Sequence, residues 1–158
     1  RPQPVGADFL QVQDEYLQVE TAAKGITDIS DLSPIQPGLY LWQGDITTLR
    51  CDAIVDAANS GLTGCYVPNH RCIDNAIHTY AGVELRLACA ELMERQGYPE
   101  PTGRAKITPA LFPTRGTNNC CAWSSSSTAM FCLKKVEAAK MIIAELIAQP
   151  ITMDRSVS

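Results

Sequence analysis

The chain has 158 residues, of which 46% are apolar and 19% are charged, and its net charge is −4. This length fits one domain with a hydrophobic core, and the acidic balance argues against a nucleic-acid-binding surface as the main function. Seven cysteines, an odd number, exclude a complete disulfide framework, and no apolar run reaches the length of a signal peptide or membrane span. We therefore expect a cytoplasmic protein with reduced thiols and no membrane partner.

The first part of the chain is polar and contains four prolines within residues 1–37. One short helix is expected over Ala7–Ala22, which either packs Tyr16 and Leu17 on the main body or forms a solvated lead-in. Proline and glycine around residue 37 mark a loop before the compact part. We divide the chain into an N-terminal extension (1–37), a compact domain (38–150) and a tail (151–158).

Strands and helices alternate through the compact part. The segment Asp52–Ala58 has a nearly continuous apolar middle, a pattern typical of a strand buried on both faces. A long helix is predicted from Asp74, a candidate cap, to Gly97, because apolar residues recur at spacings of three and four. Further strands are expected at Leu39–Gln43, Ala105–Pro109 and Cys120–Trp123, and a further helix at Val136–Ala148. This alternation indicates an α/β layered domain.

The segment GCYVPNHRCIDNAIH places Cys65, His70 and Cys72 within eight residues. Thiolates and imidazoles are ligands that Zn²⁺ prefers, and three protein ligands leave a fourth position open, as in catalytic zinc sites. Spacings of five and then two cannot share one helical face, so the three groups must converge from a loop. The alternative is two ordinary buried thiols beside a loop histidine.

Two other loops have the composition of ligand-binding loops. In GDIT, Asp45 follows a predicted strand and can accept from an exocyclic amine, or it can cap a short helical turn. In AANSGLTG, Gly61 and Gly64 permit close backbone approach, while Asn59 and Ser60 offer polar contacts. Ligands of open α/β sheets bind beyond the carboxyl ends of strands, where both loops are expected, although the same residues also favour ordinary turns.

Together, GDIT, DAIVDAANSGLTG and GCYVPNHRCIDNAIHTYAG resemble the macrodomain family, specifically its zinc-containing branch found with class M sirtuins. The resemblance is dense from about Leu39 to Pro109. It implies a three-layer α/β/α sandwich that binds ADP-ribose at the strand ends. It also implies Zn²⁺ as cofactor and removal of ADP-ribose from modified protein side chains, acidic ones in particular.

The resemblance also implies roles for single residues. Asp45 matches the adenine-contacting aspartate, with Ile46 beside it, and Asn59 matches the asparagine that contacts the distal ribose. Asp74 matches the aspartate near that ribose, which makes Asn59 and Asp74 the candidate catalytic residues. Cys65, His70 and Cys72 match the zinc ligands. The full set of expected ligand-binding residues is Asp45, Ile46, Asn59, Ser60, Gly61, Gly64, Ser127, Thr128, Ala129 and Phe131.

The chain departs from the family pattern in three places. Asp56 stands where the pattern has a second asparagine, and a buried carboxylate there needs a partner. After Pro113 the pattern's next strands are missing, which predicts an internal deletion and a sheet that is incomplete after residue 113. Ala129 replaces the glycine of the second phosphate loop.

Three functions are consistent with these observations. The first is a zinc-dependent hydrolase that removes ADP-ribose from aspartate- or glutamate-linked mono-ADP-ribosylated protein. The second is a catalytically impaired module that binds ADP-ribose without turnover, and the third is a structural zinc module. The expected partners are ADP-ribose or ADP-ribosylated protein, and no nucleic acid.

Overall fold

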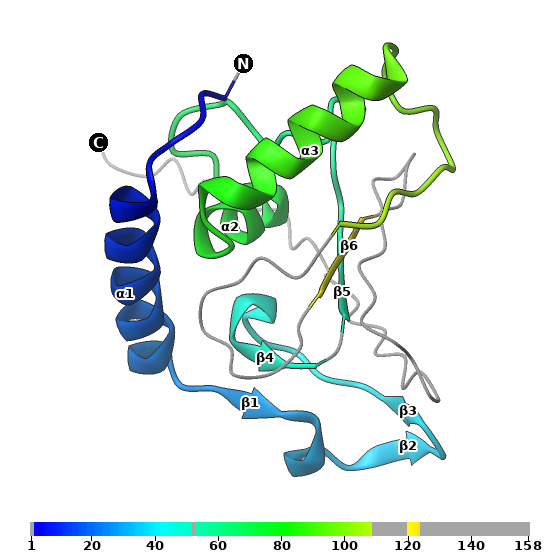
Figure 1. The fold of residues 1–158 in the computed structure, drawn as a ribbon. Coiled ribbons are helices and arrows are strands. Elements are labelled where there is room, and N and C mark those ends of the chain that lie inside the picture. The colour runs from blue at the N-terminus through cyan, green and yellow to red at the C-terminus, as the bar shows by residue number, and fades with distance from the viewer. Residues whose placement is uncertain (1, 52, 109–119, 124–158) are drawn as a thin grey trace, which may run out of the picture.

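The computed structural model describes residues 2–51, 53–108 and 120–123. Helix α1 runs along one edge of the molecule, helices α2 and α3 lie together, and short strand pairs lie below them (Figure 1). The elements in chain order are α1 (Ala7–Lys24), β1 (Thr27–Asp28), the 3₁₀ turn η1 (Ile29–Asp31), β2 (Pro34–Gln36), β3 (Leu39–Tyr40), the 3₁₀ turn η2 (Ile46–Thr48), β4 (Leu49–Arg50), β5 (Ala53–Asp56), α2 (Ile73–Tyr80), α3 (Val83–Gln96) and β6 (Cys120–Trp123).

The described strands form three two-stranded pairs. Strands β5 and β6 are parallel, in a register that places Ala53 opposite Cys120 and Asp56 opposite Trp123. Parallel neighbours need a crossover, which here passes through α2 and α3, so the predicted α/β character and the strand at Cys120–Trp123 are confirmed. Strands β1 and β4 are also parallel, while β2 and β3 form an antiparallel hairpin.

Two predicted strands differ from the structure. The strand expected at Leu39–Gln43 is shortened to the two residues of β3, which pair with a segment that begins at Pro34. Residues 105–108, expected to begin a strand at Ala105–Pro109, form no regular strand. The three-layer arrangement, the helix at Val136–Ala148 and the internal deletion involve residues outside the described ranges, and they stay predictions.

Strand β5 is buried on one face rather than two. Ile54 and Asp56 are 6% and 0% exposed, while Val55, which points to the other face, is 43% exposed. Helix α2 packs on this strand. The apolar residues of this strand therefore alternate between a buried and an exposed face, and the carboxyl group of Asp56 lies on the buried face. The sequence pattern did not predict this alternation.

The predicted long helix is broken in two. Gly82 has φ 77°, a left-handed conformation that interrupts the helix, and the side chain of Gln13 caps the second part by accepting from the N–H of Val83 at 3.0 Å. The predicted apolar stripe survives the break, because Ile77, Ala81 and Leu85 are fully buried. The core cluster contains Leu49, Cys51, Ile54, Ala58, Leu62, Ile77, Ala81, Leu85 and Cys89.

The helix ends show which residues serve as caps. Asp74, the predicted cap, lies in the first turn of α2; the cap is Cys72, whose Sγ accepts from the N–H of Asn75 at 3.4 Å. At the other end, Gly97 has φ 77° and donates its N–H to Met93, so the predicted C-terminus of the helical region is confirmed.

The N-terminal helix is confirmed and extends from Ala7 to Lys24. Leu17 is buried and Tyr16 is 61% exposed, so only one of the two expected residues packs on the body. The chain then enters β1, which pairs with β4 of the compact part. The boundary at residue 37 stays a prediction, although the segment before it contributes a strand to a pair.

Candidate functional site

A loop between β5 and α2 positions the candidate metal ligands. Gly64 has φ 84°, and a Cβ at this position would lie 2.7 Å from Nη2 of Arg86 and 2.9 Å from the ring of His78. Asn69 also has positive φ, at 57°, and the N–H of His70 closes a turn onto the carbonyl of Val67. These conformations fold the loop back over the start of α2.

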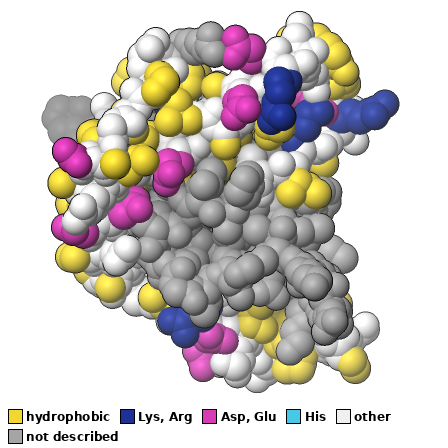
Figure 2. Space-filling model, viewed as in Figure 1, with side chains coloured by type: hydrophobic (Ala, Val, Ile, Leu, Met, Phe, Trp, Pro, Cys, Tyr) yellow, Lys and Arg dark blue, Asp and Glu magenta, His cyan; other side chains and the backbone are white. Residues whose placement is uncertain are grey.

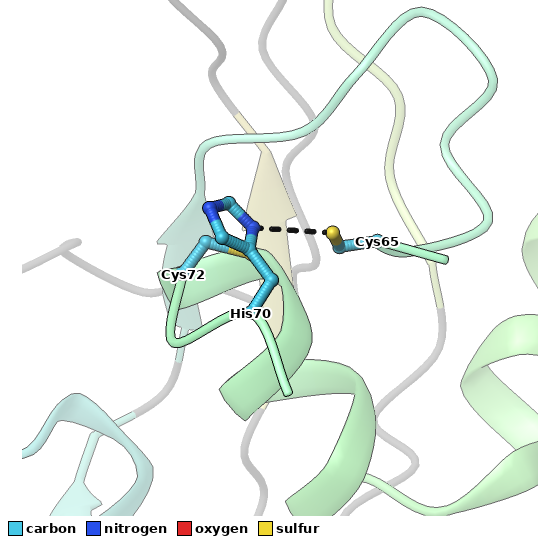
Figure 3. Close-up of side chains that lie close together, drawn as sticks. All are labelled: Cys65, His70 and Cys72. Carbon is cyan, nitrogen blue, oxygen red and sulfur yellow. Dashed lines mark hydrogen bonds between the residues drawn. The ribbon is translucent and has the colours of Figure 1, made fainter. Parts of the chain in front are cut away.

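The loop brings three metal-ligating atoms together. Those of Cys65, His70 and Cys72 all lie within 4.8 Å of one another, and Sγ of Cys65 is 3.3 Å from Nδ1 of His70. Figure 3 shows the His70 ring facing Cys65, with Cys72 at the start of the helix. A tetrahedral zinc ion with bonds of about 2.0–2.3 Å separates its ligands by roughly 3.3–3.8 Å. The donor set therefore suits zinc, and the distance between Cys65 and His70 lies in this range.

Neighbouring groups hold this cluster in place. Asn75 donates from Nδ2 to the carbonyl of His70 at 3.0 Å and from its N–H to the sulfur of Cys72. Burial raises the pKa of the Cys72 thiol, and Cys65 and Asp74 add to the effect. His70 is exposed and the two cysteines are half-buried, so the cluster opens toward solvent.

Asn59 joins the second predicted loop to the same helix. Its Nδ2 donates to the carbonyl of Gly64 at 3.1 Å and to Oδ2 of Asp74 at 3.4 Å, while its Oδ1 accepts from the N–H of Gly61 at 2.8 Å. The structure thus brings together Asn59, Asp74 and the loop that begins at Gly64. Ser60 is exposed, and its carbonyl accepts from the N–H of Glu100 at 2.8 Å.

Asp74 is a buried carboxyl beside the metal-ligand loop. It is 5% exposed, and burial raises its pKa to about 6 against the opposing effects of Arg86 and Asn59. His78 lies one turn further along α2, with Nε2 3.6 Å from Oδ1 of Asp74. Burial and Arg86 lower the pKa of His78 to about 3, so its imidazole is neutral near pH 7.

Asp56 lies behind these groups in the interior. It is completely buried, and neither carboxyl oxygen makes a regular hydrogen bond with a described residue. Burial and the charge of Asp74 raise its pKa to about 9, although the N–H of Ala57 favours the charged form. Burial also raises the pKa of Cys89 to about 12, with Asp56 and Asp74 contributing. Both groups are therefore neutral near pH 7.

Asp45 occupies a different environment. Its Oδ1 accepts from the N–H of Thr47 at 2.9 Å and from Oγ1 at 2.6 Å, so it caps η2, as the alternative interpretation expected. Its Oδ2 pairs with Nζ of Lys24 at 2.7 Å. Burial opposes ionisation of Asp45, but the hydrogen bonds from Lys24 and Thr47 outweigh it and lower the pKa. Ile46 packs against the core beside it.

Helix α2 connects the two ends of the candidate site. An open hollow of about 470 Å³ extends along it from His70 and Cys72 to Tyr80. Nζ of Lys24 lies 3.5 Å from the centre of the Tyr80 ring, and a second hollow of about 590 Å³ is lined by Lys24, Trp42 and Asp45. The predicted adenine residue Asp45 thus lines one hollow, and the candidate metal ligands His70 and Cys72 line the other.

Sequence reasoning missed Lys24, His78 and Arg86. His78 lies on α2 and Arg86 on α3, both after the loop that carries the candidate metal ligands. A helix places His78 one turn after Asp74. Nothing local in the sequence links Lys24 to Asp45, because they are 21 residues apart. The expected phosphate-loop residues Ser127, Thr128, Ala129 and Phe131 lie outside the described residues.

The model of the macro domain family matches residues 55–142, more than half of the chain. The chain belongs to the macro domain family. Its fold is accordingly the α/β macro domain fold, which agrees with the crossover seen between β5 and β6.

Curated relatives of this macro domain share high sequence identity over part of their length. A protein named protein-ADP-ribose hydrolase from Treponema medium is 57% identical over 114 residues, covering 70% of this chain and 44% of that protein. A protein of the same name from Staphylococcus aureus strain COL is 53% identical over 106 residues, which cover 66% of this chain and 40% of that protein. The chain spans less than half the length of these relatives.

Among solved structures, the Trypanosoma brucei macrodomain in complex with ADP-ribose is similar to this macro domain, with a TM-score of 0.49 and 22% identity. The match covers 78% of this chain and 55% of that one. In the part of the chain that the structure describes, no helix is long and apolar enough to cross a membrane.

Proposed function

We propose that this macro domain belongs to the zinc-containing branch and is a zinc-dependent hydrolase that removes ADP-ribose from aspartate- or glutamate-linked mono-ADP-ribosylated protein. The observation that carries the proposal is the convergence of Cys65, His70 and Cys72 at the start of α2, directly beside Asp74 and Asn59. The names of the curated relatives support the same activity.

The residues around the cluster suit this chemistry. Zinc held by three protein ligands would supply a Lewis acid with an open position. Asn59 fixes one carboxyl oxygen of Asp74, so that Asp74 is oriented to accept or deliver a proton at an attacking water. Because Asp74 is buried, this exchange takes place at a group shielded from bulk solvent.

The other hollow supports recognition of the adenine end. The carboxylate of Asp45 remains ionised because of its hydrogen bonds to Lys24 and Thr47, and an ionised carboxylate can accept from an exocyclic amine. The Tyr80 ring and the side chain of Trp42 offer apolar surface nearby. ADP-ribose would then extend along α2, with its distal ribose toward Asn59.

The test is incubation with an aspartate- or glutamate-linked mono-ADP-ribosylated protein, followed by measurement of the ADP-ribose released. Release should occur with the zinc-loaded protein, stop after chelation and return when zinc is restored. Asp74→Asn should slow release at least 100-fold, the usual contribution of a general acid or base, without loss of zinc. Equal release by chelated and loaded protein would show that the reaction does not use the metal.

A second candidate is a module that binds ADP-ribose without turnover, which the replacement of the phosphate-loop glycine by Ala129 favours. Calorimetry with ADP-ribose separates the candidates. Binding without release supports this module, while bound zinc without ADP-ribose binding supports the structural zinc module.

A further inference from the structure

The outer face of α1 carries an apolar stripe that takes no part in the candidate site. Phe9, Val12, Tyr16 and Val19 follow one another at spacings of three, four and three, so they share one helical face. They are 51%, 67%, 61% and 67% exposed. Leu17, on another face of the same helix, is the residue that packs on the body. Figure 2 shows apolar and acidic side chains interleaved at the edge where α1 runs.

Side-chain contacts in the first and second halves of α1 attach this helix to the rest of the domain. Gln13 caps α3 through the N–H of Val83, and Lys24 pairs with Asp45. These contacts fix the orientation of the helix with the stripe outward. The outward face of a surface helix is normally polar, and a contiguous apolar patch marks an interaction surface. A fixed helix also loses less conformational entropy when a partner binds.

The stripe is flanked by acidic residues on both sides. If the stripe residues occupy the a and d positions of a heptad, Asp8 and Glu15 fall at g and Glu20 falls at e, the positions that select a partner by charge. A second copy would bring acidic flanks together in either orientation, and an anionic membrane would also repel them. The charge pattern therefore fits a partner with basic flanks.

We infer that this surface, which we call the α1 stripe, docks an amphipathic helix whose apolar side chains are flanked by lysine or arginine. The partner helix would bury Phe9, Val12, Tyr16 and Val19, and its basic residues would pair with Asp8, Glu15 and Glu20. Apolar burial would supply most of the affinity and the charges would supply selectivity. This inference does not depend on the proposed hydrolase activity.

The test uses the full 158-residue chain and two fluorescent three-heptad peptides. Both have leucine at a and d; one has lysine at e and g, and the other has glutamate there. Anisotropy at low salt should show the lysine peptide binding at least tenfold more tightly, with the difference shrinking as salt screens the charges. Equal affinity of the two peptides would overturn the charge assignment.

Variants of exposed residues locate the binding. Val12→Ser combined with Val19→Ser should weaken binding of the lysine peptide by about tenfold or more, since each valine buries apolar area. Ile35→Ser, on strand β2 and 61% exposed, is the matched control and should change nothing. Reversal of the flanks with Asp8→Lys, Glu15→Lys and Glu20→Lys should switch the preference to the glutamate peptide.

Circular dichroism and thermal melting of each variant confirm that it is folded. Binding that ignores the two valine changes would place the peptide elsewhere and overturn the inference. If the parent binds phosphatidylcholine or phosphatidylglycerol vesicles but not the peptide, and the two valine changes abolish that binding, the surface contacts a membrane and the inference is wrong. If sedimentation shows dimers of the parent that the two valine changes dissociate, the surface binds a second copy of the chain and the inference is likewise wrong.

Discussion

The polar groups near the two ends of α2 differ in whether the chain itself supplies a partner of opposite charge. At its start, Cys65, His70 and Cys72 bring together donors whose mutual spacing suits an added cation. At its end, the charge of Asp45 is already balanced within the chain by Lys24, at 2.7 Å. We propose that a metal completes the first region, whereas the carboxylate of the second already has a cationic partner within the chain. The difference shows that polar side chains can converge either around a cation supplied by the chain or around the place for an added one.

The largest expected effect is loss of zinc from the start of α2. We expect about one zinc per chain, and almost none in Cys72→Ser or His70→Ala, because two ligands hold zinc far more weakly than three. Cys51→Ala changes a buried thiol outside the cluster and should keep its zinc. Elemental analysis measures the content, and a folded parent without metal would contradict the zinc site.

The next largest effect concerns Asp56 in the interior behind that site. Its pKa is about 9 in the folded chain against 3.8 for the unperturbed group, so between these values the folded state holds a proton that the unfolded state releases. The contribution of Asp56 to the free energy of unfolding should therefore fall as pH rises from about 4 to about 9, by about 4 kcal/mol at pH 7, while the low pKa of His78 opposes this fall below about pH 6.5. Asp56→Asn should remove most of this fall and stabilise the protein at pH 7.

Denaturant unfolding at several pH values measures the effect. Glu91→Gln, which changes an exposed acidic residue, is the control and should leave the pH dependence as it is in the parent. If stability falls no more between pH 5 and pH 8 in the parent than in Asp56→Asn, the carboxyl of Asp56 does not hold its proton.

Affinity for two ligands distinguishes the proposed adenine end from the proposed ribose end of the ADP-ribose site. Asp45→Ala should weaken binding of ADP and ADP-ribose alike, by about tenfold for the loss of a charged acceptor. Asn59→Ala should weaken ADP-ribose more than ADP, because only ADP-ribose carries the distal ribose. Calorimetry with both ligands distinguishes these effects, and Glu91→Gln serves as a control for the change in charge. If both variants bind ADP and ADP-ribose as tightly as the parent, Asp45 and Asn59 do not contact the ligand.

A smaller effect is expected at Ala129, which lies outside the described residues. A glycine there can adopt φ > 0 and bring its N–H close to a phosphate oxygen, a conformation that costs alanine roughly 1 kcal/mol. Ala129→Gly should therefore tighten ADP-ribose binding about fivefold. Unchanged affinity for ADP-ribose would show that this loop does not reach the diphosphate.

The smallest effect concerns the ion pair at the end of α2. The side chains of Lys24 and Asp45 are 31% and 42% exposed, so Lys24→Met should lower the free energy of unfolding by less than about 1 kcal/mol, and less still in concentrated salt. Denaturant unfolding at two salt concentrations tests this. A loss of several kcal/mol would mean that α1 depends on this single contact for its position.

Local patterns predicted the parts of the fold that local forces determine. The stripe through Ile77 and Leu85, the helix end at Gly97 and the convergence of Cys65, His70 and Cys72 were all predictable from spacing. The break at Gly82 was not predicted, because a lone glycine is tolerated within a helix. It is stabilised here by Gln13, which lies 70 residues from the N–H that it caps.

Burial of polar groups was the other part that sequence did not predict. The pattern of DAIVDAA indicated a strand but not that Asp56 lies on its buried face and Val55 on its exposed one. The role of Lys24 was hidden for the same reason as that of Gln13, because both act across long sequence separations. The candidate ligands were predictable since they lie close together in the sequence, and Asn75, which holds two of them, lies beside them. Asn59, which holds Asp74, lies 15 residues away on another loop.

X-ray absorption at the zinc edge tests the central claim most directly. We expect two sulfur ligands at about 2.3 Å, one nitrogen at about 2.0 Å, and one light-atom ligand that changes when ADP-ribose is added. That result would place an exchangeable position beside Asp74. Three or four sulfur ligands, with Cys121 or Cys132 completing the set, would contradict it and make the site structural.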